Sequence, residues 1–266
     1  MTIGKLQFQK NNGDRSMEIH EKTDREKHGK ILGIDSSGLV AGIAVTEGET
    51  LLAEYDINYK KTHSQTLLPM MDEVRNMLGL DLYTIDAIAV ASGPGSFTGL
   101  RIGSATAKGL GLALVKPLVE VPTLEGLAYN LWGSKDFICP IIDARRNQVY
   151  TGIYCFEEGR LVTCRPQMAA DIRELIEQLG EMALKSGKSV IFLGDGVPVY
   201  RDIIMENIHV PCFFAPASCN RQRAGSIAAL GSVYYAEGRF VAARDHQPEY
   251  LRQSQAERER EEKKKD

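Results

Sequence analysis

Two acidic residues stand at the ends of apolar runs, where a strand would deliver a carboxylate to the edge of a sheet. Asp35 closes the run ILGID and is followed by Ser36, Ser37 and Gly38, and Asp143 closes the run FICPIID. A carboxylate beside hydroxyl groups is a ligand set for hydrated Mg²⁺ and nucleotide phosphates. The same pattern also fits an Asx turn, in which Asp35 would cap its own hairpin.

A glycine turn, GDG, ends a later apolar run and offers room for an adenine. The predicted nucleotide cleft therefore comprises Asp35, Ser36, Asp143, Gly194 and Gly196. Weakly bound ATP or ADP with Mg²⁺ is the one cofactor that these residues suggest, in a cleft between two lobes. Against it, Asp143 is followed by ARR and not by the glycines that let a phosphate approach the backbone.

The segment SGPGSFTGLRIG, residues 92–103, lies between an apolar run and a helical pattern, a context in which helix N-termini bind phosphate. It contains no G-x-x-x-x-G-K-[ST] motif, and Thr98 stands where G-x-G-x-x-G needs its third glycine. The alternative is a tight turn in which Ser96 or Thr98 caps the following helix.

The helix predicted for about residues 98–114 has two ridges with almost no side chains. Gly99, Gly103, Ala107 and Gly111 form one ridge, and Ala105, Gly109 and Ala113 form the other. Each glycine costs a helix about 0.8–1 kcal/mol relative to alanine, so close approach of another backbone must compensate. One ridge is expected to pack on the helix's own sheet, and the second indicates a protein partner.

A preceding helix, in SQTLLPMMDEVRNMLGL, adds adaptable methionine surface to this prediction. Its Pro69 means that the helix either starts late or is kinked. The predicted partner interface comprises Leu67, Met70, Met71, Val74, Gly99, Ile102, Gly103, Thr106, Ala107 and Gly111.

Motifs for metal binding and covalent catalysis are missing from the sequence. The five histidines form no H-x-x-x-H or H-E-x-x-H pair, the five cysteines form no C-x-x-C pair, and no G-x-S-x-G is present. We therefore expect no metal site, no catalytic residue and no independent enzyme.

The elements that position these residues follow one order twice. Residues 31–57 predict three antiparallel strands, followed by helix, strand and helix, and the pattern restarts near Phe137. A late helix is predicted at AGSIAALGSVYYAEG, about residues 223–238. Two α/β lobes with mixed sheets fit this order better than a doubly wound parallel sheet.

Composition narrows the function further. The 266 residues carry a net charge of −3, whereas proteins that hold nucleic acid alone are usually basic, so any tRNA contact is expected only through a complex. No apolar run reaches the roughly 18 residues of a membrane span, and we expect a cytoplasmic protein without a membrane partner. The polar ends, residues 1–29 and 252–266, are expected to be disordered or solvated.

Several segments closely resemble the TsaB (YeaZ) family: HSQTLLPMMDEV, IDAIAVASGPGSFTGLRIGSATAKGLGLAL, PLVEVPTLEGLA and the late PEYLR. The resemblance covers about residues 30–252. It implies two RNase H-like lobes of the actin-like, sugar-kinase and heat-shock-chaperone fold. The lobes would span residues 30–125, with the late helix packing back, and residues 126–222.

The resemblance also implies a function. TsaB-like proteins are non-catalytic, activating partners of the TsaD-like subunit, which transfers a threonylcarbamoyl group to the adenosine following the tRNA anticodon. The two helices would dock onto TsaD, or form a homodimer without it, and a TsaE-like ATPase would join. TsaD-like relatives carry H-x-x-x-H where this chain has His63 and Leu67. The alternatives are an independent nucleotide-binding or hydrolysing enzyme of this fold and, more remotely, a metallopeptidase.

Overall fold

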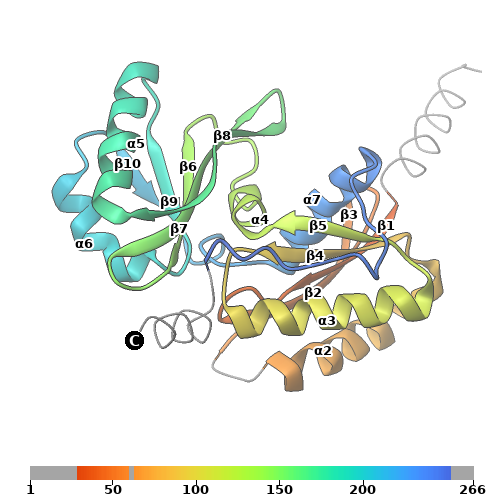
Figure 1. The fold of residues 1–266 in the computed structure, drawn as a ribbon. Coiled ribbons are helices and arrows are strands. Elements are labelled where there is room, and N and C mark those ends of the chain that lie inside the picture. The colour runs from red at the N-terminus through yellow and green to blue at the C-terminus, as the bar shows by residue number, and fades with distance from the viewer. Residues whose placement is uncertain (1–28, 60–62, 253–266) are drawn as a thin grey trace, which may run out of the picture.

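A computed structural model describes residues 29–59 and 63–252 of the chain. It contains two five-stranded sheets, each built from one half of the described sequence, with helices on both faces (Figure 1). We call the first sheet with the helices that pack on it lobe 1, and the second sheet with its helices lobe 2.

The sheet of lobe 1 begins as the predicted antiparallel meander. Strands β1 (Lys30–Asp35), β2 (Val40–Glu47) and β3 (Thr50–Asn58) pair in sequence order. β4 (Ala87–Gly93) and β5 (Leu118–Pro122) then add parallel to β1, giving the order β3-β2-β1-β4-β5. Parallel neighbours need a crossover connection, and helices supply it here.

Two of these helices cover one face of the sheet. α2 (His63–Leu78) and α3 (Phe97–Leu114) run beside each other there, and α7 (Ala224–Ala236) covers the opposite face (Figure 1). A short 3₁₀ helix, η1 (Leu82–Thr84), follows α2. Pro69 lies inside α2, so the late start considered from the sequence is wrong.

Lobe 2 repeats the strand order of lobe 1. β6 (Phe137–Asp143), β7 (Gln148–Glu157) and β8 (Arg160–Asp171) form a meander, and β9 (Val190–Leu193) and β10 (Cys212–Phe214) add parallel to β6. The order β10-β9-β6-β7-β8 is that of lobe 1. The predicted fold class, two RNase H-like lobes in an actin-like arrangement, is confirmed.

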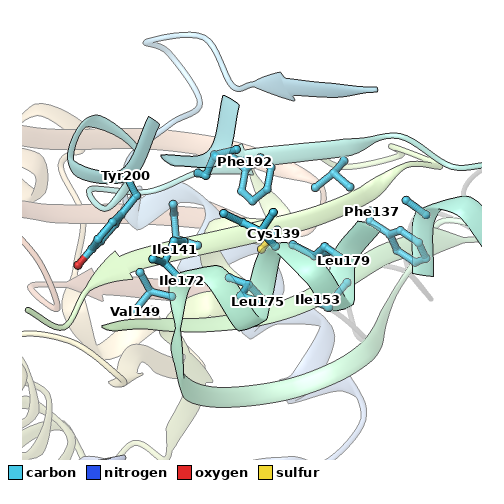
Figure 2. Packing of buried hydrophobic residues seen from close by; sticks show 14 of the residues in the cluster. Phe137, Cys139, Ile141, Val149, Ile153, Ile172, Leu175, Leu179, Phe192 and Tyr200 are labelled. Atoms are coloured by element: carbon cyan, nitrogen blue, oxygen red, sulfur yellow. The ribbon is translucent and has the colours of Figure 1, made fainter. Parts of the chain in front are cut away.

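The helices of lobe 2 differ from the prediction in detail. α5 (Ile172–Ser186) starts later than expected, because residues 169–171 complete β8. α6 (Val197–Asn207) and β10 were not predicted. The apolar cluster between α5, α6 and the sheet is shown in Figure 2, where the Tyr200 hydroxyl points away from the apolar side chains.

α4 (Thr123–Tyr129) joins the lobes, and the predicted boundary at 125/126 falls inside it. Its Leu124 and Leu127 are buried in a cluster with residues of lobe 2, including Ile138 and Tyr154, while the same helix contacts α7 of lobe 1. Beyond its end, Trp132 is 62% exposed, and its ring centroid lies 6.3 Å from that of Phe156.

Strand β3 caps a helix of the same lobe. Glu54 accepts a hydrogen bond from the Gly225 N–H (2.8 Å) and forms an ion pair with Arg223, while Asp56 accepts from the Ala224 N–H (3.2 Å). These carboxylates take the place of an N-cap side chain at the start of α7.

The predictions for the two polar ends lie outside the described residues, apart from Gly29 and Arg252. Among the helices of the described part, none has the length and apolarity that crossing a membrane requires.

Candidate functional site

A cavity of about 450 Å³ lies where the two lobes meet. The β1–β2 turn and the start of α3 line it from lobe 1, and the ends of β6 and β9 line it from lobe 2. Its polar lining includes Ser37, His63, Asp143, Arg145, Asp195 and Glu249.

Asp35 is not part of this lining, because its carboxylate turns back into its own hairpin. The residue is 1% exposed, and its Oδ1 accepts hydrogen bonds from the Ser37 backbone N–H (2.8 Å) and hydroxyl (2.7 Å). Burial raises the pKa of Asp35 to about 6, although the Ser37 bonds and the nearby His63 oppose the rise. The structure thus shows the Asx turn, and the Asp35 carboxylate lies outside the lining of the cavity.

The glycine-rich segment packs against the same hairpin. The Ser36 hydroxyl donates to the Gly99 carbonyl (2.8 Å), and Ser96 caps α3 by accepting from the Gly99 N–H (3.3 Å). A Cβ on Gly95 or Gly99 would lie 2.2 or 2.1 Å from a backbone carbonyl oxygen of this turn. These glycines therefore permit close backbone approach within the lobe, and the capped-turn alternative holds.

Asp143 does line the cavity, but its carboxylate is already engaged. It accepts from the Arg145 N–H (2.8 Å) and the Tyr200 hydroxyl (3.0 Å), and its own N–H donates to Asp195 (3.1 Å). Burial raises the pKa of Asp195. The sequence analysis missed Asp195 as a lining residue, although its place after β9 parallels that of Asp143 after β6.

Gly194 and Gly196 serve the packing of lobe 2. A Cβ on either would lie 2.2 or 3.0 Å from the carbonyl oxygen of Ile141, so neither opens a path for a ligand. Of the five residues predicted to hold a nucleotide, only Asp143 lines the cavity. A nucleotide in this cavity would therefore meet Asp143, Asp195 and Arg145 and not the other four predicted residues.

A C-terminal strap, residues 246–252, runs across the mouth of the cavity. The Glu249 N–H donates to the Ser92 carbonyl of lobe 1 (2.7 Å), and the Tyr250 ring packs on Phe97 at a centroid distance of 4.5 Å. Arg252 then reaches lobe 2, donating to the Ala144 carbonyl (3.2 Å). The sequence analysis noted PEYLR only as a family resemblance, and nothing in its pattern predicts a strap.

His63, the first residue of α2, contacts the Gly38 carbonyl through its Nε2 (2.8 Å). Four positions on, Leu67 is fully buried in the core of lobe 1. Within residues 29–59 and 63–252, no three His, Cys, Asp or Glu side chains are grouped so that they could hold a metal ion.

The residues predicted to contact a partner lie mostly inside lobe 1. Eight of them are buried: Leu67, Met70, Met71, Val74, Gly99, Gly103, Ala107 and Gly111. Ile102 and Thr106 are half-buried. The ridge from Gly99 to Gly111 is the one that packs on the lobe itself, since a Cβ on Gly103 would meet the Ser36 hydroxyl at 2.4 Å. In the isolated chain these eight residues are therefore covered by lobe 1 itself.

The second small-residue ridge of α3 faces outward. Ala105, Gly109 and Ala113 are exposed, as is Leu112 beside them. Val115 follows at 88% exposure, and α2 adds Leu68 and Met77, the latter 79% exposed. We call these exposed residues of α2 and α3 the outer helix face.

Comparisons with known proteins agree with this architecture. The sequence model of the family described as "TsaD: tRNA N6-adenosine threonylcarbamoyltransferase" matches residues 50–260. The chain is 34% identical to the tRNA threonylcarbamoyladenosine biosynthesis protein TsaB of Bacillus subtilis over 85% of this chain and 96% of that protein. It is 29% identical to TsaB of Escherichia coli, with the same coverage.

A solved structure from Pseudomonas aeruginosa, described as an uncharacterized protein with similarity to peptidase YEAZ, has a TM-score of 0.71. It is 26% identical and covers 84% of this chain and all of its own. The match over nearly the whole length of the TsaB proteins, together with the duplicated lobe order, confirms the resemblance inferred from the motifs. The chain belongs to the TsaB family of tRNA threonylcarbamoyladenosine biosynthesis proteins.

Proposed function

We propose that this chain is a non-catalytic, activating subunit in the formation of threonylcarbamoyladenosine in tRNA, docking onto a TsaD-like transferase through its outer helix face. Gly109 carries the proposal. A Cβ at this position would have nothing within 4 Å, in contrast to Gly99, Gly103 and Gly111 on the buried ridge.

A helix glycine without an internal neighbour is unfavourable in the isolated chain. It costs about 1 kcal/mol relative to alanine, and no packing within the lobe returns that energy. A missing side chain does help when a second helix approaches closely, because the shallow groove shortens the distance between the helix axes. The exposed Leu112 and Val115 alongside supply apolar area for such a contact.

The chain's part in the reaction would be to position its partner. Docking would favour the conformation of the transferase that is competent for acyl transfer, provided that this conformation binds the outer helix face more tightly. Leu67 is buried in the core, and the Asp35 carboxylate is bound within its own turn, so neither is free to act on a substrate. Both observations favour an activating role over a catalytic one. A TsaE-like ATPase would join the pair, and the same face would form a homodimer when the transferase is absent.

The docking face is tested with Gly109→Leu. Because the added side chain projects into open space, lobe 1 should fold normally while the affinity for the TsaD-like transferase falls at least tenfold. Gly180→Leu on α5 is the matched control, since a Cβ on Gly180 also has nothing within 4 Å. Calorimetric titration gives the affinity, and nucleoside mass spectrometry gives the modified tRNA. Unchanged affinity of the Gly109 variant would overturn the docking face.

A second candidate, weak binding of ATP or ADP with Mg²⁺, rests on the cavity and its acids Asp143 and Asp195. Calorimetry of the isolated chain with Mg-ATP tests it. A saturable heat of binding that disappears in Asp143→Asn would support an independent nucleotide-binding protein. If no heat of binding is measured, nucleotide binding by the isolated chain is ruled out.

A further inference from the structure

We propose that four arginines around the β6–β7 turn bind the phosphate backbone of tRNA when the chain is assembled with its transferase. We call Arg145, Arg146, Arg173 and Arg252 the arginine patch. The inference rests on the proposed function, because it takes the tRNA to be the substrate of the assembled complex.

Two members of the patch sit in the turn itself. The Ala144 N–H donates to the Gln148 carbonyl (2.9 Å), and the Gln148 N–H donates to the Arg145 carbonyl (3.2 Å). These bonds close a tight hairpin turn that carries Arg145 and Arg146, both of which are exposed.

Two further segments bring their arginines to the same turn. The Ile172 N–H at the start of α5 donates to the Asn147 carbonyl (3.1 Å), which places the exposed Arg173 beside the turn. From the strap, Arg252 donates to the Ala144 carbonyl (3.2 Å). Three segments that are far apart in the sequence thus place their arginines around the β6–β7 turn.

These charges are not consumed by ion pairs within the described part of the chain. The ion pairs found there involve other cations, such as Arg223 with Glu54. The carboxylates of Asp143 and Asp171 accept hydrogen bonds from the backbone N–H groups of Arg145 and Arg173, both at 2.8 Å. No ion pair within this part of the chain neutralises the four arginines, although one N–H of the Arg252 guanidinium donates to the Ala144 carbonyl.

The backbone of the turn points to a role for the side chains. Arg145, Arg146 and Asn147 have φ values of 63°, 56° and 59°, in the left-handed region. Hairpin turns of this kind favour Asn-Gly, and a long side chain is disfavoured there. Arginines held in such a conformation are therefore better explained by what their side chains bind than by the turn itself.

Aromatic rings beside the patch favour RNA over an acidic protein. The Arg252 guanidinium lies 5.7 Å from the centroid of the Tyr150 ring, and Tyr250 packs on Phe97 at the cavity mouth. Unpaired RNA is recognised by stacking on such rings and on arginine planes, together with phosphate contacts. All four cations are arginines, which match phosphate geometry with paired N–H donors.

The net charge of −3 fits a contact that supplements another RNA surface. The patch would add affinity only after docking brings tRNA close.

The test replaces both turn arginines in Arg145→Gly/Arg146→Gly. Glycine accepts the left-handed backbone, so the melting temperature should stay the same or rise. The variant is assembled with the transferase, and tRNA binding is measured between 50 and 200 mM salt. We expect at least tenfold weaker binding, and a slope of log K against log salt that is shallower by about 1–2. Arg160→Ala/Lys185→Ala, which removes two exposed charges elsewhere on lobe 2, should leave binding unchanged.

Each other outcome has its own meaning. Unchanged tRNA affinity in an intact complex overturns the arginine patch and leaves the proposed function standing. Loss of assembly by the glycine variant overturns the RNA assignment in favour of a protein contact. An equal loss of tRNA binding in the control also overturns it. Failure of the unaltered chain to assemble with the transferase overturns the proposed function itself.

Discussion

A carboxylate buried as fully as that of Asp35 makes stability depend on pH. Its pKa is about 6 in the folded protein and 3.8 in the unfolded reference, so the folded state holds this proton more tightly. The group's contribution to stability is therefore greatest below pH 3.8 and declines as the pH rises to about 6. A shift of about two pKa units corresponds to roughly 3 kcal/mol.

Asp35→Asn removes the titrating group, and with it the loss of stability as the pH rises. The asparagine keeps a side-chain oxygen that can accept both Ser37 hydrogen bonds. The variant's free energy of unfolding, relative to that of the unaltered chain, should therefore rise between pH 4 and pH 7. Urea denaturation of both chains at several pH values measures this difference. If the free energies of unfolding of the two chains ran parallel across this pH range, the raised pKa of Asp35 would be contradicted. Under the proposed function, tRNA modification by the complex should survive the change.

Asp35 also marks how far single residues can be read from the sequence. Its position after an apolar run correctly predicts a strand end, because apolar periodicity reports burial. The direction of its side chain depends on Ser37 and on the packing of α3 over the turn, which involves residues about 60 positions away. Sequence spacing therefore left the metal ligand and the Asx turn as alternatives.

At the scale of elements, the start of α7 depends on strand β3. Glu54→Ala would leave the Gly225 N–H without its acceptor and Arg223 without its ion pair. We expect a loss of about 1–2 kcal/mol in the free energy of unfolding, as for a lost N-cap. Hydrogen exchange should quicken in the first turn of α7. Glu47→Ala is the control, because its exposed pair with Lys30 (3.4 Å) is worth less. Equal effects in the two variants would contradict the capping role.

The pattern of elements was predictable where periodicity was strong and failed where local signals competed. The meanders and α3 follow clear patterns, whereas α6 was missed although Val197, Tyr200 and Ile204 share one buried face. It begins directly after a glycine turn and carries Pro198 in its first turn, and both features are as typical of loops as of a helix start. Likewise, the two smooth ridges of α3 are equivalent in sequence, and only the position of the sheet decides which one is buried.

At the scale of the whole molecule, α4 holds the two lobes together. Leu127→Ala would open a cavity in the cluster that this helix shares with lobe 2. We expect a loss of about 2–5 kcal/mol and a broader thermal transition in which the lobes unfold less cooperatively. Calorimetry measures both effects. Leu184→Ala, at an exposed position of α5, should change neither. A single sharp transition in the Leu127 variant would contradict this coupling role of the α4 cluster.

Trp132 gives this molecule a built-in optical probe. It is the chain's single tryptophan, and it lies just beyond α4, largely exposed to solvent and with its ring next to that of Phe156 from lobe 2. Excitation at wavelengths that tyrosine does not absorb therefore reports on one location, the junction between the lobes. Any rearrangement of the lobes on assembly would shift its emission maximum or its quenching by acrylamide, without a label and without a mutation.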